Sequence, residues 1–295
     1  MKHLQTYRLF ESTRTLTKEQ KAFLDKYVGV NGTWKLNLQT GKIDVDGAFF
    51  CHYEGLKDED FLGLSFGTVS RYFTVEGNSL QDMSMTPRRV GEGFTVSENE
   101  NIGSLKGGPE YVGGSYVCMG CNLESLEGVP KKVGGDFVCS DNNLRTLAEA
   151  PLEVGGGFYC SGNPLVSLEG SPRIVKGNFK CEREILQSIK GAPEVIGGEF
   201  IADVPGGELI VPAGKWSFET LLKMWVDPNQ EEYIRRILVT YFDPETLQQM
   251  IDQNPEKMLI KMKEHLKDPH FKGLKWPKHL EKEKDLLSDL SDVGL

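Results

Sequence analysis

Residues 133–153 read VGGDFVCSDNNLRTLAEAPLE, and residues 154–174 read VGGGFYCSGNPLVSLEGSPRI. Each stretch begins with a valine followed by glycines, has an aromatic residue four positions after the valine, and has a cysteine two positions after that. The two stretches are copies of one unit. A unit this short cannot bury its own apolar residues, whereas stacked copies bury them against one another, so the sequence predicts a solenoid.

The unit recurs on both sides of this pair. Its copies begin at Val69, Val90, Val112, Val133, Val154, Val175 and Ile196. Successive copies begin 21, 22, 21, 21, 21 and 21 residues apart. A looser copy begins at Val45, so we expect about eight short strands, one in each unit, that pair side by side in a parallel sheet.

Each predicted strand has an aromatic residue and, two positions later, a small residue. The aromatic positions are Phe49, Phe73, Phe94, Tyr116, Phe137, Phe158, Phe179 and Phe200. The small positions are Cys51, Val75, Val96, Cys118, Cys139, Cys160, Cys181 and Ala202. Residues two apart on a strand point to the same side, so both positions should face the core. We therefore expect reduced core cysteines rather than disulfides or a zinc site, including the pair Cys118-x-x-Cys121.

Two further columns of the repeat have structural explanations. Asparagine follows the small position by three residues and should satisfy buried backbone groups of neighbouring coils. These residues are Asn78, Asn99, Asn142 and Asn163, and Cys121 takes the same place in its unit. Glycine follows the start by two residues and should form a corner that needs a positive φ or a close backbone approach. These residues are Gly47, Gly114, Gly135, Gly156, Gly177 and Gly198.

The spacing F-x-C-x-x-N-x-L resembles the leucine-rich-repeat signature L-x-L-x-x-(N/C)-x-L, and the resemblance covers residues 45 to about 207. The 21-residue length and the consensus VGGxFxCSxNxLxSLEGxP are similar to those of short repeats of the bacterial and bacteriophage type. The resemblance implies an α+β fold built on a leucine-rich-repeat solenoid. Glu184 replaces the repeated asparagine, and Arg71 and Glu92 replace the corner glycine, so we expect less regular geometry at both ends of the array.

A solenoid needs a cap at each end of its apolar core. Thr17 and Gln20 fit a capping box that opens a helix, and residues 34–36 and 43–45 fit a hairpin around a turn at 39–41. Beyond about Gly214, four capping residues before prolines signal helix starts. These pairs are Asp227-Pro228, Asp243-Pro244, Asn254-Pro255 and Asp268-Pro269. We therefore expect three parts: an N-terminal segment, helix and hairpin (1–44), the solenoid (45–214), and a C-terminal α-helical domain (215–295).

The first dozen residues, MKHLQTYRLFES, resemble the N-terminal capsid-targeting peptides of tailed phages, in which a protease cuts after Leu/Ile-x-Glu. The resemblance implies a processing site between Glu11 and Ser12. An amphipathic segment that packs on the capping helix would also explain these residues, and the sequence leaves both interpretations open.

Composition excludes several classes of function. The 295 residues contain no run of about 18 apolar residues, and the N-terminus lacks the apolar core of a secretory signal, which predicts a cytoplasmic protein without a membrane partner. The 43 acidic against 34 basic residues, net charge −9, argue against a nucleic-acid partner. No nucleotide-binding, metal-binding or catalytic motif occurs, so we expect no enzyme, no cofactor and no metal.

The outer side of the predicted strands is the candidate protein-binding surface, expected to be the concave strand face. Its residues are Phe50, His52, Tyr53, Tyr72, Thr74, Glu76, Thr95, Ser97, Val117, Met119, Val138, Ser140, Tyr159, Ser161, Lys180, Glu182 and Ile201. Aromatic and β-branched residues suit a protein-binding strip, although they also favour strands for structural reasons.

Our leading hypothesis is a non-enzymatic protein-protein interaction module, phage-encoded and located in the host cytoplasm. It would bind a host or phage protein through this face, the C-terminal domain, or both. The alternative is a structural or packaged internal protein of a tailed-phage virion.

Overall fold

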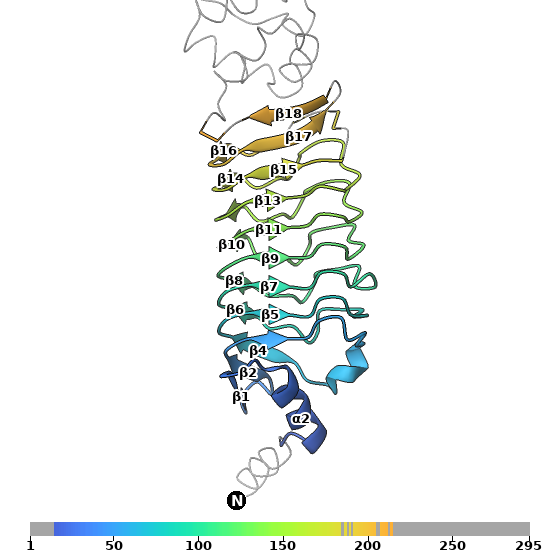
Figure 1. Cartoon of the computed structure of the whole chain (residues 1–295), viewed down its shortest axis with the longest axis vertical. Coiled ribbons are helices and arrows are strands. Elements are labelled where there is room, and N and C mark those ends of the chain that lie inside the picture. Colours follow the sequence, from blue (N-terminus) through green and yellow to red (C-terminus); the bar gives the residue numbers. More distant parts are fainter. Residues whose placement is uncertain are drawn as a thin grey trace, which may run out of the picture. The chain divides into compact units, whose positions relative to one another are not determined.

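The structure is a computed structural model that describes residues 15–183, 186–187, 189, 191–204, 207–211 and 213–214. These residues form a β-solenoid in which short parallel strands stack coil upon coil (Figure 1). Helix is confined, within this part of the chain, to α2 (Lys18–Tyr27) and the 3-10 turn η1 (Asp58–Phe61). None of the described helices combines the length and hydropathy needed to cross a membrane. The predicted C-terminal α-helical domain (215–295) lies outside the described residues.

The first sheet, sheet A, contains the predicted strands. Its parallel strands are β3 (Phe49–Phe50), β5 (Phe73–Thr74), β7 (Phe94–Thr95), β9 (Tyr116–Val117), β11 (Phe137–Val138), β13 (Phe158–Tyr159), β15 (Phe179–Cys181) and β17 (Phe200–Val204). The register places each aromatic residue beside the next, as in Phe137↔Phe158. The prediction of eight parallel strands with this spacing is confirmed.

A second sheet, sheet B, was not expected. It contains β1 (Thr33–Leu36), β2 (Ile43–Asp46), β4 (Phe66–Val69), β6 (Arg89–Val90), β8 (Tyr111–Val112), β10 (Lys132–Val133), β12 (Glu153–Val154), β14 (Ile174–Val175) and β16 (Val195–Ile196). The predicted parallel sheet is therefore one of two sheets in the solenoid. Each coil is extended on both sides of the glycine corner, so the valine that starts a unit pairs with the valines of adjacent coils, as in Val133↔Val154. This pairing satisfies backbone groups that one sheet alone would leave exposed.

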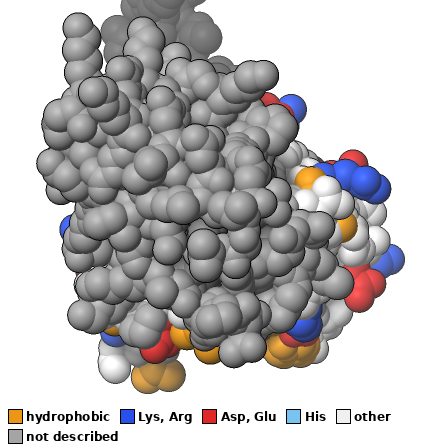
Figure 2. All heavy atoms as spheres, turned by 90° about the horizontal axis from the view of Figure 1, so that it is seen from above, with side chains coloured by type: hydrophobic (Ala, Val, Ile, Leu, Met, Phe, Trp, Pro, Cys, Tyr) orange, Lys and Arg blue, Asp and Glu red, His pale blue; other side chains and the backbone are white. Residues whose placement is uncertain are grey.

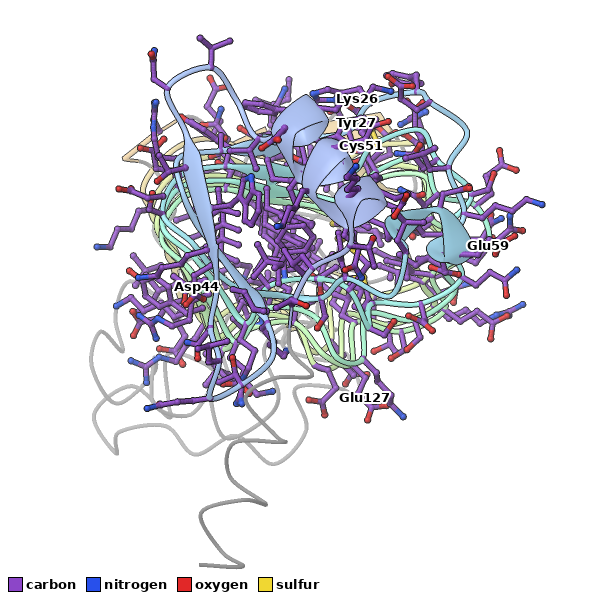
Figure 3. The ribbon with its side chains drawn as sticks, turned by 90° about the horizontal axis from the view of Figure 1, so that it is seen from below. Lys26, Tyr27, Asp44, Cys51, Glu59 and Glu127 are labelled. Atoms are coloured by element: carbon purple, nitrogen blue, oxygen red, sulfur yellow. The ribbon has the colours of Figure 1, made fainter. Side chains whose placement is uncertain are left out.

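The core consists of side-chain columns that run along the stack. Neighbouring rings of the aromatic column lie 4.9–5.9 Å apart between centroids from Phe49 to Phe200. The six cysteines are buried and free, so the prediction of reduced core residues is confirmed. Figure 3 shows side chains filling the interior of the coils beneath α2, with Cys51 among them.

The asparagine column satisfies backbone groups of two adjacent coils, as predicted. The Asn142 side-chain amide donates to the carbonyl oxygens of Cys118, Cys139 and Ser140 at 2.9, 3.0 and 3.1 Å. Its Oδ1 accepts from the backbone N–H groups of Cys121 and Leu123, both at 3.0 Å. In the unit that has cysteine instead, Cys121 Sγ donates to the Val96 carbonyl oxygen at 3.1 Å, so the thiol replaces part of the amide's bonding.

The glycine corners are explained by close approach of successive coils. A Cβ on Gly134 would lie 1.9 Å from the carbonyl oxygen of Gly113, and a Cβ on Gly135 would lie 2.8 Å from the backbone of Gly114. Of the corner glycines predicted from the sequence, Gly47 has a positive φ, +130°. A side chain would therefore push two coils apart at most of these corners.

Both ends of the solenoid carry local structure that departs from the repeat. At the N-terminal end the predicted capping box is present, with Gln20 N–H donating to Thr17 Oγ1 at 3.2 Å, and Leu24 and Tyr27 of α2 are buried. The predicted hairpin is also confirmed as the antiparallel pair β1 and β2. At the other end, β17 pairs antiparallel with β18 (Gly207–Val211), a closing hairpin that the sequence did not suggest.

Candidate protein-binding surface

The outer face of sheet A does not expose all of its residues equally. The exposed ones are Phe50, His52, Tyr53 and Tyr72. Those half-buried are Glu76, Thr95, Val117, Met119, Val138, Tyr159, Ser161, Lys180 and Glu182. Those buried are Thr74, Ser97, Ser140 and Ile201. The buried residues cannot contribute contact area to a partner, so we leave them out of the candidate surface. Exposure is concentrated at the N-terminal end of the sheet.

Phe50, His52, Tyr53 and Tyr72 form a group that we call the aromatic cluster. Strand alternation explains its position: Phe49 and Cys51 point into the core, so Phe50 and His52 point outward. The centroid of the Phe50 ring lies 5.7 Å from that of His52 and 6.4 Å from that of Tyr72, and the planes of these two rings are within 24° of parallel to the Phe50 ring. The register Phe49↔Phe73 holds the two strands that carry these rings side by side.

Tyr53 is positioned by a column of residues that turn the chain away from sheet A. This corner column has a positive φ at every member: Tyr53, Gly77, Glu98, Gly120, Asp141, Gly162 and Arg183. Glycine alternates with larger residues, so a side chain can lie over the glycine of the next coil. A Cβ on Gly77 would lie 2.2 Å from Cδ1 of Tyr53, which means that the Tyr53 ring occupies this space.

The same arrangement recurs further along the column. Asp141 Oδ1 and the Arg183 guanidinium form an ion pair at 2.9 Å, and a Cβ on Gly162 would lie 2.3 Å from Asp141 Oδ1 and 3.2 Å from Arg183 Nη2. Glu98 and the rest of this column could not be recognised from the inward positions of the repeat alone. Aligning the repeats at the residue before the asparagine would have shown the alternation.

Carboxylates surround the aromatic cluster. Hydrogen bonding to Glu98, with burial and the charge of Glu76, raises the pKa of Tyr53, and hydrogen bonding to Glu92 raises the pKa of Tyr72. Glu76 also lies 3.6 Å from His52, measured from Oε2 to Nδ1. Carboxylates therefore lie beside both phenol hydroxyls and favour their protonated form.

Arg71 and Glu92, the two residues at corner positions that other units fill with glycine, pair with each other at the edge of this cluster. The distance from Arg71 Nε to Glu92 Oε1 is 3.2 Å, and the guanidinium carbon lies 5.6 Å from the centroid of Tyr72. The parallel register of sheet A continues through these coils, as in Phe73↔Phe94. The less regular geometry expected at this end of the array occurs in sheet B, where the register shifts between Ile43 and Val45.

A groove of about 430 Å³ adjoins the cluster. Its walls are the loop Gly29–Thr33 on one side and Phe50, Arg71 and Tyr72 on the other. Val30 in this loop is 94% exposed, which extends the apolar area beyond the sheet. Sequence analysis did not identify this loop, because its role depends on the fold that brings it beside β3 and β5.

A second groove, of about 510 Å³, lies on sheet B and includes Asp44, which Figure 3 labels. Asp44 Oδ1 accepts from the Thr68 N–H at 3.0 Å, and Oδ2 accepts from the Asn37 amide at 3.1 Å. The register shifts between Ile43 and Val45 where β2 pairs with β4, so Asp44 satisfies a backbone group beside this irregularity. This carboxylate has a structural explanation.

The buried cysteine thiols also have a structural rather than a chemical role. Burial raises the pKa of the Cys51 and Cys121 thiols to about 11, and that of Cys118 well above its ordinary value, so these thiols are protonated at neutral pH. The described residues contain no group of three or more His, Cys, Asp or Glu arranged to hold a metal ion. The predicted processing site at Glu11 and Ser12 lies outside the described residues and stays a prediction.

Charged side chains elsewhere on the solenoid pair between adjacent coils. Lys132 and Glu153 lie 2.8 Å apart across sheet B, and Lys106 and Glu127 lie 2.9 Å apart on another side of the coils. Figure 2 shows basic and acidic side chains together at the margin of the described surface. Exposed pairs of this kind contribute little to stability, so they fit a solvated exterior rather than a site.

Comparisons with protein-family models, with curated proteins and with solved structures gave no match. The candidate surface is defined by the aromatic cluster, the adjoining groove, and the carboxylates beside the tyrosines.

Proposed function

We propose that the chain is a non-enzymatic protein-protein interaction module that binds a host or phage protein through the aromatic cluster and the adjoining groove. The observation that supports this most is the exposure of large aromatic side chains on rigid strands. Tyr53, Tyr72 and Phe50 are 63%, 41% and 38% exposed. Tyrosine and arginine dominate the energetics of protein interfaces, and Arg71 lies at the edge of the same cluster.

The physical argument is one of unused apolar area. The aromatic column of the core already fills the interior, so the outward rings add nothing to its packing. Exposed apolar area beside a groove marks an interaction surface when it is contiguous, and Val30, Phe50 and Tyr72 border one groove. The strands that carry the rings are fixed by backbone pairing, so little conformational entropy is lost on binding.

Affinity capture from host extract with matched variants tests this proposal. Tyr72→Ala should reduce recovery of the partner at least tenfold, as expected for an interface tyrosine. Tyr111→Ala is the matched control, because Tyr111 is 44% exposed on sheet B and should leave recovery unchanged. Equal recovery with both variants would contradict the proposal.

The finer assignments rest on sequence. We also propose that the chain belongs to the leucine-rich-repeat class, is phage-encoded and lies in the host cytoplasm. These proposals are supported by the repeat consensus and by the resemblance of the N-terminus to capsid-targeting peptides. The virion alternative is tested by mass spectrometry of purified particles: an N-terminus at Ser12 would support packaging, and absence of the protein from particles would exclude it.

A further inference from the structure

We propose that Tyr53, Glu76 and Glu98 form a seat for an arginine side chain of the protein partner. The inference rests on the proposed function and specifies the chemistry of the partner. It depends on the ring face that Tyr53 presents, on the charges around it, and on the cation–ring pairs that the chain already contains.

Tyr53 presents a fixed, flat face. One side of the ring lies over Gly77, where a Cβ would be 2.2 Å from a ring atom. The carboxylate of Glu98, in the next coil but one, raises the pKa of the hydroxyl, and Tyr53 remains 63% exposed. Because one face of the ring is covered by the Gly77 backbone and most of the residue is exposed, the opposite face is open.

The charges beside this ring are unbalanced. Lys26 pairs with Glu54 at 3.2 Å, and Arg71 pairs with Glu92. Glu76 has His52 as its ion-pair partner, and no lysine or arginine of the described residues pairs with Glu76 or Glu98. Two carboxylates next to an exposed ring favour a cation, since the face of an aromatic ring is the negative part of its quadrupole.

Other tyrosines of the chain already hold such cations. The Arg89 guanidinium carbon lies 4.3 Å from the ring centroid of Tyr111, and the Lys26 ammonium lies 4.5 Å from that of Tyr27. Tyr72 has Arg71. Within the part of the chain that the structure describes, no lysine or arginine lies over Tyr53, the most exposed of these tyrosines. The position over Tyr53 therefore fits a cation from another molecule.

Backbone conformation alone does not mark this position, because every member of the corner column has a positive φ. Tyr53 has φ +50°, and Glu98, Asp141 and Arg183 adopt the same left-handed conformation at their places in the column. Tyr53 is distinguished from these three by its exposed aromatic ring.

Arginine fits the site better than lysine. A planar guanidinium can lie on the ring and still donate hydrogen bonds at its edge to Glu76 and Glu98, whereas an ammonium is compact and more strongly hydrated. The chain's net charge of −9 also attracts a basic partner at long range.

The test uses the full chain, labelled with ¹⁵N, and three pentapeptides of sequence Gly-Ser-X-Ser-Gly, in which X is arginine, lysine or citrulline. Citrulline has the shape of arginine without its charge. Amide shifts on titration report where each peptide binds. We expect the arginine peptide to shift Tyr53, Gly77 and Glu98, with affinity about tenfold above that of the citrulline peptide and above that of the lysine peptide.

Two variants link the shifts to the site. Tyr53→Gly removes the ring while suiting the backbone at φ +50°, so the fold is kept, and Glu98→Gln removes one charge. Both should abolish or weaken the shifts, and Tyr111→Ala should not. Equal binding of the citrulline peptide, binding retained by Tyr53→Gly, or shifts spread over all acidic positions would overturn the proposal, and tighter lysine binding would overturn the choice of arginine.

Failure here is distinguishable from failure of the proposed function. If Tyr72→Ala abolishes partner capture while the arginine peptide does not bind at Tyr53, the interaction surface stands and its chemistry is wrong. If the peptide binds at Tyr53 and capture is unaffected by Tyr72→Ala, the seat stands and the cluster is not the partner's main contact.

Discussion

Replacing Asn142 with aspartate tests the asparagine column with a change of very few atoms. The wild-type amide donates to three carbonyl oxygens and its Oδ1 accepts from two backbone N–H groups, all in the buried interior between coils. Asn142→Asp keeps the shape and the acceptor, but it places a charged oxygen where the amide nitrogen donated. That oxygen faces the carbonyl groups of Cys118, Cys139 and Ser140, none of which can donate.

The structure sets the expected size of the effect. Leaving a buried charge without adequate partners costs about 3–5 kcal/mol, and the two remaining N–H donors keep the cost from rising further. Asn143→Asp is the matched control: it is the next residue, it is exposed, and its change should alter the free energy of unfolding by less than about 0.5 kcal/mol.

The effect should also depend on pH with a defined sign. Burial among carbonyl oxygens raises the pKa of the new carboxyl in the folded state above its unfolded value of about 3.9, because the neutral form can donate a hydrogen bond. The penalty is fully present above the folded-state pKa. It decreases as the pH falls through that pKa towards the unfolded one.

Urea unfolding of the full chain, followed by circular dichroism at pH 7 and at pH 5, measures both quantities against wild type at the same pH. We expect a loss of about 3–5 kcal/mol at pH 7 and a smaller loss at pH 5. A loss equal to that of Asn143→Asp, or a loss independent of pH, would refute the role of the column in satisfying the backbone.

Four other substitutions test the side-chain assignments by the same unfolding measurement. Phe137→Ala should lower the free energy of unfolding by about 3–5 kcal/mol, because it leaves a cavity between Tyr116 and Phe158. Val138 points outward and is half-buried, so Val138→Ala should lower it by less than about 1 kcal/mol. Equal losses would mean that the inward and outward assignments are wrong. Tyr116→Phe should stabilise the protein by about 1–2 kcal/mol, because the buried Tyr116 hydroxyl lacks a hydrogen-bond partner, and destabilisation would point to a partner not yet seen. Tyr53→Gly should leave stability unchanged or raise it by about 1 kcal/mol while peptide binding is lost, and a large destabilisation would show that the ring serves the fold.

The inward columns could be predicted because they repeat identical chemistry at a fixed spacing. Phe137 and Cys139 lie two apart, and the same pair recurs in adjacent units, so period and side are both defined by the sequence. Asn142 was predictable for the same reason. The repeat therefore determines which side chains enter the core.

Sheet B could not be recognised by the same means. Its strands after β4 are two residues long, as in Lys132–Val133, which is too short for an alternating pattern to show. Val133 was identified as the start of a unit, but its pairing with Val112 and Val154 depends on the coil closing back on itself. The β17–β18 hairpin lies where the repeat ends, so no repeated pattern predicts it.

The candidate surface was predicted as a face, and the structure narrowed it to one end. Phe50 and Tyr72 were identified from the strand alternation, but the loop Gly29–Thr33 that completes the groove lies outside the repeat. Glu98 raises the pKa of Tyr53 from two coils away, a relation that exists only once the coils are stacked.

Hydrogen exchange of the captured complex tests the central claim most directly, because it locates the contact without substitutions. If the aromatic cluster binds the partner, peptides covering residues 29–33, 49–54 and 71–77 should become protected on binding, and those covering β11 (Phe137–Val138) and β13 (Phe158–Tyr159) should not. Protection confined to other segments, with residues 49–54 and 71–77 unchanged, would contradict the account.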